Sequence, residues 1–363
     1  MRVLFITSHR DALNSIRPEA EMFIGLAKAG VELTVMTQDD SVYAEPMRQA
    51  GIRLIGYHPA RKLEPRAILR IRRELRRGAF DIVQMFNNKA IANGLLAAVG
   101  LPVKAITYRG QTGNISRRDP SCYLTHLSPR VDRIVCVAEA VRRDLATQVR
   151  HPEMLVTIYK GHDLAWYEGV PPATRSGLGV PEDAVLIVCV ANNRPRKGVP
   201  VLIRAAALLP SDCNACIVLV GRGMTSPEIR QQINDSGCPE RFRCFEFRSD
   251  ALAVTAACDI AVLPSVRREG LPKTVIEAMA LGVAPIVSDT GGSAELVVDG
   301  ESGLVVPPGD PAALAQAIAA LCANPSRRRA MGAAARLRLG TSFRVEDAVA
   351  AHLALFRQVL ATT

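Results

Sequence analysis

The chain has 363 residues, of which 48% are hydrophobic and 4% aromatic, with 45 Lys and Arg against 35 Asp and Glu. This composition excludes a disordered or fibrous chain and is typical of an aliphatic globular protein. The length favours two domains of about 150 to 200 residues over one small core.

Neither a membrane span nor a secretory leader is expected. No apolar run reaches the ~18 residues that cross a bilayer, and we interpret residues 2–7 as a first strand because no cleavage site follows them. Nine cysteines, several inside predicted buried strands, favour a reducing compartment, the cytoplasm. Cys213 and Cys216 form a C-x-x-C without a second pair or a nearby His, so no metal is expected.

In the first half of the chain, apolar strands alternate with amphipathic helices, which is the pattern of a parallel sheet covered on both faces. We predict strands at 2–7, 31–37, 52–55, 81–85, 103–107 and 133–137, and helices near 17–29, 64–78, 89–99 and 138–149. One doubly wound domain accounts for this half.

The alternation breaks between residues 166 and 181, which are rich in Gly and Pro and suggest an interdomain linker. It then restarts. Strands are predicted at 185–190, 217–220, 242–245, 259–263, 284–287 and 304–306, and helices begin near 199, 226, 250, 272, 293 and 311. A last helix is predicted at 344–360.

Positive charge is concentrated in the first half. Residues 1–165 hold 25 Lys and Arg against 16 Asp and Glu, a net of +9, whereas residues 166–363 have a net of +1. Residues 61–77 alone hold eight basic side chains interleaved with Ile and Leu, which predicts a basic amphipathic helix. Such a helix suits an anionic membrane surface, the alternative being a solvated helix face. Nucleic acid is not expected as a partner, because no stacking aromatics accompany the basic residues.

The most informative motif is Glu269-Gly-Leu-Pro-Lys-Thr-Val-Ile-Glu277, in which two glutamates stand eight residues apart around a predicted helix start. Pro272 suits the first helical position, with the helix running over 273–281. The free N–H groups and the helix dipole favour a phosphate at this start, beside Glu269.

The spacing of the two glutamates suits a sugar nucleotide. Glu277 lies six residues beyond Leu271, roughly 9 Å along the axis, a span comparable to that from a sugar across a diphosphate to a ribose. Carboxylates at the two ends could accept hydrogen bonds from hexose and ribose hydroxyls. An ordinary amphipathic helix with one solvated Glu and one capping Glu is the alternative.

A basic loop, Asn192-Asn-Arg194-Pro-Arg196-Lys197-Gly198, follows the strand predicted at 185–190. Cations at the carboxyl end of a strand suit a diphosphate leaving group, and we assign Lys197 and Arg194 to it. A solvated basic turn is the alternative, and it fits Arg196 better than Lys197.

Further motifs surround the two glutamates: Asp259-Ile-Ala-Val-Leu-Pro-Ser265 precedes them, and Ser288-Asp-Thr-Gly-Gly292 and Gly303-Leu-Val-Val-Pro-Pro-Gly-Asp310 follow. Together with the E-x7-E spacing, they resemble the signature region of the family 4 (group 1) glycosyltransferases, of the bacterial cell-envelope glycan type. Weaker similarity extends over nearly the whole chain.

This resemblance implies the α/β fold called GT-B, in which two doubly wound, Rossmann-like domains face each other across a cleft. It assigns acceptor binding to residues 1–165, with the helix at 344–363 crossing back onto that domain. Nucleotide-sugar binding is assigned to residues 184–343, after a linker at 166–183.

The predicted site combines the two motifs with positions matched through the resemblance. Glu269, Lys197 and Arg109 are expected to take part in catalysis. Donor contacts are expected from Asn192, Arg194, Lys197, Gly221, Glu269, Gly270, Leu271, Lys273, Thr274 and Glu277.

Two of the departures from the family pattern fall on residues of the predicted site. Asn192 stands five residues before Lys197, where the family usually has Arg. Arg109 and Gly110 follow Thr107-Tyr108, where the family often has His. Arg109 cannot act as a base at neutral pH, although it could hold a leaving phosphate or an acceptor.

The predicted function is transfer of a hexosyl unit, with retention of configuration and without a metal or other cofactor, from a nucleotide diphosphosugar to a hydroxyl. A UDP-sugar is favoured over a GDP-sugar as the donor. The expected acceptor is a cell-envelope glycan or lipid-linked glycan such as lipopolysaccharide core, reached at the cytoplasmic face of the inner membrane. Two alternatives stay open: a sugar-nucleotide epimerase of the same fold, and a non-catalytic partner that binds a sugar nucleotide or glycan.

Overall fold

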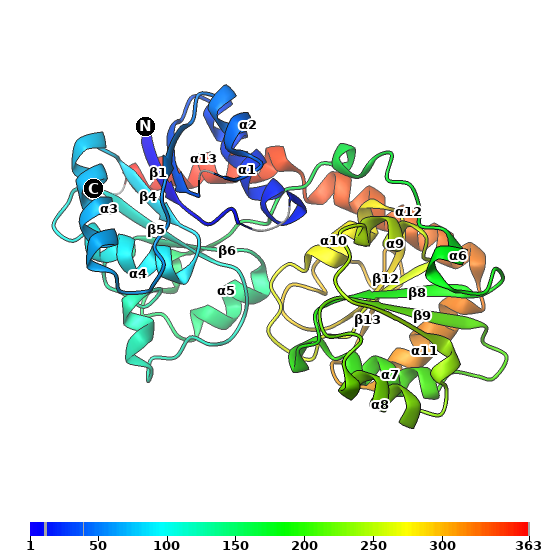
Figure 1. Cartoon of the computed structure of the whole chain (residues 1–363). Coiled ribbons are helices and arrows are strands. Elements are labelled where there is room, and N and C mark those ends of the chain that lie inside the picture. Colours follow the sequence, from blue (N-terminus) through cyan, green and yellow to red (C-terminus); the bar gives the residue numbers. More distant parts are fainter. Residues whose placement is uncertain (11–12, 39, 362–363) are drawn as a thin grey trace. The chain divides into compact units, whose positions relative to one another are not determined.

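The computed structural model describes residues 1–10, 13–38 and 40–361 (Figure 1). It divides into two compact units, unit 1 (Met1–His162 with Phe343–Thr363) and unit 2 (Asp163–Ser342). Each contains a parallel sheet with helices on both faces. The predicted α/β class with two doubly wound sheets is therefore confirmed.

The sheet of unit 1 has the strand order β3-β2-β1-β4-β5-β6-β7, and all of its strands are parallel. The strands are β1 (Arg2–Ile6), β2 (Glu32–Thr37), β3 (Arg53–Gly56), β4 (Ile82–Met85), β5 (Lys104–Arg109), β6 (Arg133–Cys136) and β7 (Leu155–Thr157). The helices are α1 (Leu13–Lys28), α2 (Ala44–Gln49), α3 (Pro65–Gly78), α4 (Asn88–Ala97), α5 (Glu139–Ala146) and α13 (Val345–Ala361), with short 3-10 turns at Pro120–Leu124 and Pro152–Met154.

The C-terminal helix α13 belongs to unit 1, where it packs against α1 (Figure 1). Phe356 is fully buried in the same core cluster as Phe5 of β1. Just before α13, Phe343 O accepts a backbone hydrogen bond of 2.7 Å from His162 N. The two ends of the chain are thus joined in one core.

The sheet of unit 2 has the strand order β10-β9-β8-β11-β12-β13, and it is also parallel throughout. Its strands are β8 (Val185–Val190), β9 (Ala215–Val220), β10 (Phe242–Phe245), β11 (Ile260–Leu263), β12 (Ala284–Ser288) and β13 (Leu304–Val306). Its helices are α6 (Arg175–Leu178), α7 (Val199–Ala207), α8 (Pro227–Asp235), α9 (Ala251–Ala256), α10 (Lys273–Ala280), α11 (Pro311–Cys322) and α12 (Pro325–Ser342), with 3-10 turns at Leu164–Tyr167, Pro195–Lys197 and Pro239–Arg241.

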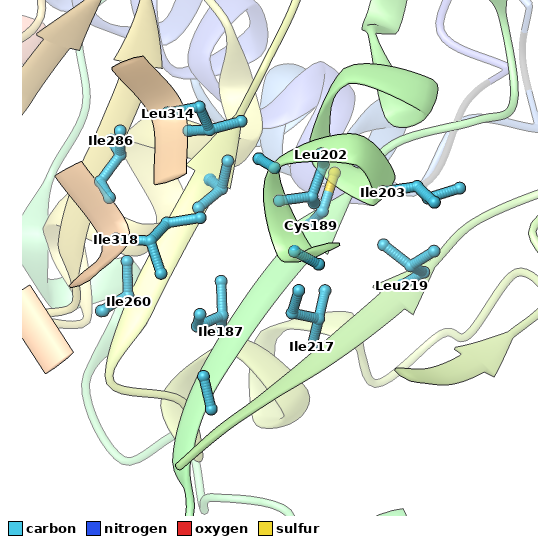
Figure 2. Packing of buried hydrophobic residues seen from close by; sticks show 14 of the residues in the cluster. Ile187, Cys189, Leu202, Ile203, Ile217, Leu219, Ile260, Ile286, Leu314 and Ile318 are labelled. Atoms are coloured by element: carbon cyan, nitrogen blue, oxygen red, sulfur yellow. The ribbon is translucent and has the colours of Figure 1, made fainter. Parts of the chain in front are cut away.

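Both faces of the unit 2 sheet are buried, which explains why its strands read as continuous apolar runs. Figure 2 shows one face, where side chains of β8 and β9 such as Ile187 and Ile217 meet Leu202 of α7 and Ile318 of α11. A second cluster on the other face includes Val188.

The stretch 166–183, predicted as a linker, is packed within unit 2. Leu178 and Val180 are buried in its core, and the Arg175 guanidinium donates to the carbonyls of Pro181 and Ala184, both at 2.9 Å. Its Gly and Pro residues shape turns in a stretch that apolar side chains anchor.

The prediction of a helix beginning near residue 293 is wrong, because residues 291–297 form turns and a bend. The carbonyls of Glu295 and Leu296 accept hydrogen bonds from the Arg338 side chain of α12, at 3.0 and 2.8 Å. These carbonyls thus find their hydrogen-bond donor on α12, a helix that the sequence analysis did not predict. Among the described residues, no helix has both the length and the apolar character needed to span a membrane.

Candidate functional site

The predicted donor residues gather at the carboxyl edge of the unit 2 sheet. The strand order reverses between β8 and β11, which are neighbours in the sheet. Loops that follow the strands on either side of such a reversal leave a crevice, and this is where doubly wound sheets bind ligands. The basic loop follows β8 and Glu269 follows β11, so the two motifs meet at this point.

The basic loop is held against the end of β11 by its backbone. Val266 N donates to Arg196 O at 2.9 Å. Gly198 has φ +68°, and a Cβ there would lie 1.8 Å from Pro264 O. Only glycine permits this approach, so Lys197 is fixed beside the segment that carries Glu269.

Glu269 is the centre of a charged cluster. It is 4% exposed, and its Oε1 accepts hydrogen bonds from Lys197 Nζ and Ser265 Oγ, each at 2.7 Å. Arg196 Nη1 lies 3.5 Å from the same oxygen and donates to the Arg268 carbonyl at 2.9 Å. Two residues predicted from separate motifs, Lys197 and Glu269, are therefore in direct contact.

The second glutamate lies on α10, one turn beyond Lys273. Lys273 Nζ is 3.1 Å from Glu277 Oε1, and Glu277 is 7% exposed. Burial raises the pKa of Glu277, against the opposing effect of Lys273. Pro272, which was predicted as the first helical residue, is instead the N-cap, with an extended backbone, and α10 begins at Lys273.

Between the two glutamates, Gly270 is buried while Leu271 and Thr274 are partly buried at the start of α10. Gly291, after β12, approaches this turn closely, since a Cβ on it would lie 2.2 Å from Glu269 O. Backbone contacts from a neighbouring strand end therefore support Glu269.

Asn192 and Gly221 connect the β8 loop to the end of β9. Gly221 has φ +147°, and a Cβ there would lie 1.9 Å from Ala191 O. Asn192 Oδ1 accepts a hydrogen bond from Arg222 N at 3.2 Å. Asn192, which stands where the resemblance would place an Arg, thus orders the loop after Gly221.

Arg194 is exposed. Arg196, for which the sequence favoured a solvated position, contacts Glu269. The 3-10 turn Pro195–Lys197 rotates the loop so that Arg196 and Lys197 both reach that carboxylate. Pro195 was the only local signal for this turn.

Arg109 belongs to unit 1, as the last residue of β5. It is 6% exposed, and its guanidinium donates to the Gly113 carbonyl. Burial lowers the pKa of Arg109, partly offset by Asp144, whose carboxylate accepts from Gly113 N at 2.7 Å. Arg109 is thus tied into the loop that follows its own strand.

Comparison with protein families gives two matches that follow each other along the chain. The family described as glycosyltransferase family 4 matches residues 20–166, and the family described as glycosyl transferases group 1 matches residues 172–338.

Two relatives illustrate the range of similarity. The GDP-mannose-dependent alpha-(1-6)-phosphatidylinositol monomannoside mannosyltransferase of Mycolicibacterium smegmatis is 27% identical over 88% of this chain and 89% of its own. The lipopolysaccharide core biosynthesis mannosyltransferase LpcC of Rhizobium leguminosarum bv. viciae is 29% identical over 68% of this chain and 70% of its own.

Solved structures share the fold at low identity. A glycosyltransferase from Rickettsia africae ESF-5 superposes with a TM-score of 0.81 at 18% identity, covering 100% of this chain and 99% of that one. Anabaena Alr3699/HepE in complex with UDP gives a TM-score of 0.76 at 20% identity, covering 99% and 100%. The fold of this chain is therefore that of known glycosyltransferases.

Proposed function

This chain belongs to the family 4, group 1 glycosyltransferases, and we propose that it transfers a hexosyl unit from a nucleotide diphosphosugar to a hydroxyl of a cell-envelope glycan or glycolipid. The observation that carries the donor assignment is the pair of contacts Lys197–Glu269 and Lys273–Glu277 at the reversal point of the unit 2 sheet.

The donor diphosphate would be held by cations and by the start of α10. Lys197 gives one of its three N–H donors to Glu269, so the others can reach a phosphate. Arg196 and Arg194 extend the positive charge of this loop, and the first N–H groups of α10 add a neutral anion site. Charge built up on the leaving diphosphate would be stabilised here without a metal.

The two carboxylates would accept hydrogen bonds from the sugars at the two ends of the diphosphate. Glu277 would accept from the ribose hydroxyls and Glu269 from the hexose hydroxyls. In the transfer step, the bond from the anomeric carbon to the phosphate oxygen breaks. The bond from the acceptor oxygen forms on the same face, which retains configuration. The proton of the acceptor hydroxyl passes to the leaving phosphate oxygen.

The names of two relatives favour a particular donor. The relative from Mycolicibacterium smegmatis is named as GDP-mannose-dependent, and LpcC is named as a mannosyltransferase. GDP-mannose is therefore the first donor to test, ahead of the UDP-sugar that we expected. The named acceptors of these relatives, a phosphatidylinositol monomannoside and a lipopolysaccharide core, support a glycolipid or envelope-glycan acceptor.

Helix α3 supports action at an anionic membrane surface, on its cytoplasmic side. Ala67, Ile71 and Leu75 are buried, while Leu69 is 64% exposed. Around Leu69, the side chains of Arg66, Arg70, Arg73 and Arg77, with one carboxylate from Glu74, line a hollow of about 490 Å³. Exposed leucine among arginines suits a bilayer interface with acidic headgroups.

Calorimetric titration with GDP-mannose and UDP-glucose tests the proposal, together with a chromatographic assay of donor hydrolysis in EDTA. Wild type should bind one donor and hydrolyse it slowly, and Lys197→Ala and Glu277→Ala should lose most of that affinity. Arg329→Ala, which removes an exposed cation of unit 2, is the matched control and should bind normally.

Product analysis separates the alternatives. Release of an epimerised sugar without an acceptor would identify an epimerase, and donor binding without any turnover would identify a non-catalytic partner. If neither donor binds wild type, the assignment of the unit 2 site is refuted.

A further inference from the structure

The C-x-x-C of Cys213 and Cys216 is split by the sheet of unit 2. Cys216 belongs to β9 and is buried in the core cluster that contains Val188. Cys213, just before β9, packs against the cluster on the opposite face, which contains Ile187. The two thiols therefore lie on opposite faces of the sheet and do not form the redox pair that this motif provides in other proteins.

The thiol that Cys213 contacts is that of Cys322, the last residue of α11. Their side chains are hydrogen-bonded to each other, and both are partly buried against the same cluster. The fold brings them together, because α7 and α11 pack against each other on this face, where Leu202 and Ile318 meet (Figure 2). Both helices follow strands of the parallel sheet and lead back to its amino edge, at which the two cysteines stand.

Arginine side chains hold the main chain at both cysteines. Arg241 Nη1 donates to Cys213 O at 2.6 Å. Arg328 Nη1 donates to Cys322 O at 3.4 Å, and Arg328 Nε lies 3.4 Å from Asp259 Oδ1, just before β11. Tertiary contacts thus keep the two positions in place, while the half-buried thiols stay within reach of a small oxidant.

The two thiols have different chemical roles in this pair. Burial, with smaller contributions from Cys213 and Asp259, raises the pKa of Cys322 to about 12, although Arg328 opposes the rise. Cys322 therefore keeps its proton at neutral pH and donates it in the hydrogen bond to Cys213. Cys213 is the acceptor, so it is the thiol that ionises first. Because the thiolate is the nucleophile in thiol chemistry, Cys213 is the attacking residue and Cys322 the resolving one.

We propose that Cys213 and Cys322 are a redox modification site at the amino edge of the unit 2 sheet, where a hydroperoxide converts them into a reversible disulfide. This inference goes beyond the proposed function and does not depend on it. A metal site is a poorer use of the pair, because thiolate metal sites take three or four protein ligands. Within the described part of the chain, no group of three or more His, Cys, Asp or Glu could hold a metal ion.

The oxidation proceeds in two steps. The Cys213 thiolate attacks one oxygen of the peroxide, so that an S–O bond forms, the O–O bond breaks and hydroxide leaves, which gives a sulfenic acid. The Cys322 sulfur then attacks the Cys213 sulfur, so that the S–S bond forms and the S–O bond breaks, and the released oxygen leaves as water with the Cys322 proton. The two thiols together lose two electrons, and the peroxide is reduced to water. A dithiol reductant reverses the change.

The disulfide would stabilise unit 2 without reaching the donor site. It would join two points about 110 residues apart in the chain, and a cross-link that closes a long loop restricts the unfolded state most. Cys213 lies before the first residue of β9, whereas Gly221 of the predicted donor site follows its last one. Six strand residues, at ~3.3 Å each, separate the two by roughly 20 Å.

Peptide mass mapping of the full reduced chain, after hydrogen peroxide treatment and alkylation of the remaining thiols, tests the proposal. The expected result is one linked pair of peptides that carries Cys213 and Cys322 and that dithiothreitol separates. Cys213→Ser and Cys322→Ser should each abolish it. Cys244→Ser, which removes another half-buried thiol packed against the same cluster, is the matched control and should retain it. Absence of the linked pair in a chain that still unfolds cooperatively overturns the proposal, as does linkage of Cys213 to Cys216 instead.

Trapping of the intermediate with dimedone tests the two roles. In Cys322→Ser, peroxide should leave Cys213 as a sulfenic acid that dimedone labels. In Cys213→Ser, Cys322 should be labelled at least tenfold less. Equal labelling of the two cysteines overturns the assignment of Cys213 as the nucleophile.

Calorimetric unfolding and GDP titration of the reduced and linked forms test the consequence. The linked form should unfold at a Tm higher by about 5 °C or more, and both forms should bind GDP with affinities within about twofold. An unchanged Tm overturns the stabilising role, and loss of GDP binding on linkage alone overturns the separation of the two sites. If neither form binds GDP, the donor site is refuted, and the mass mapping still decides the redox site.

Discussion

The two sheets have the same topology but encode their sites differently. Each reverses strand order between its first and fourth strands, β1 and β4 in unit 1 and β8 and β11 in unit 2. In unit 2, the charged side chains at this point come from two short segments, 192–197 and 265–277. In unit 1, they are Glu19, Lys89 and Lys160, three single positions far apart along the chain. The topology of the sheet determines where a ligand can bind. The chemical class of that ligand can be predicted from the sequence only where the residues of the site form a compact motif.

The carboxylates at the two reversal points also differ in their electrostatics. Burial raises the pKa of Glu277, with Lys273 only partly opposing it. For Glu19, burial is outweighed by His9, and the pKa is lowered. Glu277 therefore gains from a ligand that donates hydrogen bonds to it, while Glu19 is already held ionised by its neighbours.

The largest difference between the two regions should be seen on removing their lysines. Lys197→Ala should lower kcat/KM for transfer by roughly 10² to 10³, because it removes a preorganised cation from the leaving phosphate. Lys160→Ala should act mainly on the KM for the acceptor. Steady-state kinetics with each substrate varied in turn measures both, and equal effects of both variants on kcat would contradict the division of labour.

The backbone packing of the unit 2 site predicts a large effect on stability. Gly198→Ala introduces a Cβ 1.8 Å from Pro264 O at φ +68°, which should cost about 3 kcal/mol in the free energy of unfolding and lower the Tm of unit 2 by roughly 6 to 12 °C. Gly309→Ala has a similar φ of +77° but meets nothing within 4 Å, so only about 1 kcal/mol of strain is expected.

Calorimetric unfolding of both glycine variants measures the contrast. Equal shifts in Tm would mean that the clash at Gly198 is relieved at little cost. The close approach of the two loops would then not be what fixes Lys197.

The two carboxylates predict stability changes of opposite sign. A carboxyl with a raised folded-state pKa destabilises the fold as pH rises past its unfolded value near 4.5, so Glu277→Gln should become more stable relative to wild type from pH 4.5 to 7. A lowered pKa contributes stability that is present above that pH and is lost on acidification below it, so Glu19→Gln should become less stable relative to wild type as the pH rises towards 4.5 from below. Urea unfolding at several pH values checks both, and trends of the same sign would refute the contrast.

These differences explain how far the sequence alone could lead. Strand and helix alternation predicted all six strands of the unit 2 sheet and six of the seven in unit 1, where β7 was missed, because buried parallel strands are continuous apolar runs. Glu269, Glu277 and Lys197 could be found because they stand close together in sequence next to helix and strand ends. The helix α12 was missed because its arginines satisfy distant carbonyls, as Arg338 does, instead of forming a clear apolar stripe.

The pair His9 and Glu19 could not be predicted from spacing. The two residues lie ten positions apart, across a turn and the start of α1, and only the fold joins them. Arg196 was undervalued for a related reason, since its contact with Glu269 depends on the 3-10 turn at Pro195. Polar groups that meet through tertiary structure leave little local signal.

The smallest predicted effect concerns the basic face of α3. Arg73→Ala should weaken binding to vesicles with anionic lipid by about 1 kcal/mol, roughly fivefold, because one cation near the surface contributes about that much. Co-sedimentation with vesicles measures it, and Arg329→Ala in unit 2 is the matched control. The effect should shrink at high salt, where exposed charges are screened.

A contrary outcome would also be informative about the two units. If Arg329→Ala weakened vesicle binding as much as Arg73→Ala, attraction to lipid would follow the net charge of the whole chain. If neither variant changed it, the arginines would only solvate the outer face of α3, whose inner face is already buried through Ile71 and Leu75. Selective loss at Arg73, by contrast, ties the membrane to the unit that the family resemblance assigns to acceptor binding, so that one unit would collect the acceptor while the other holds the donor.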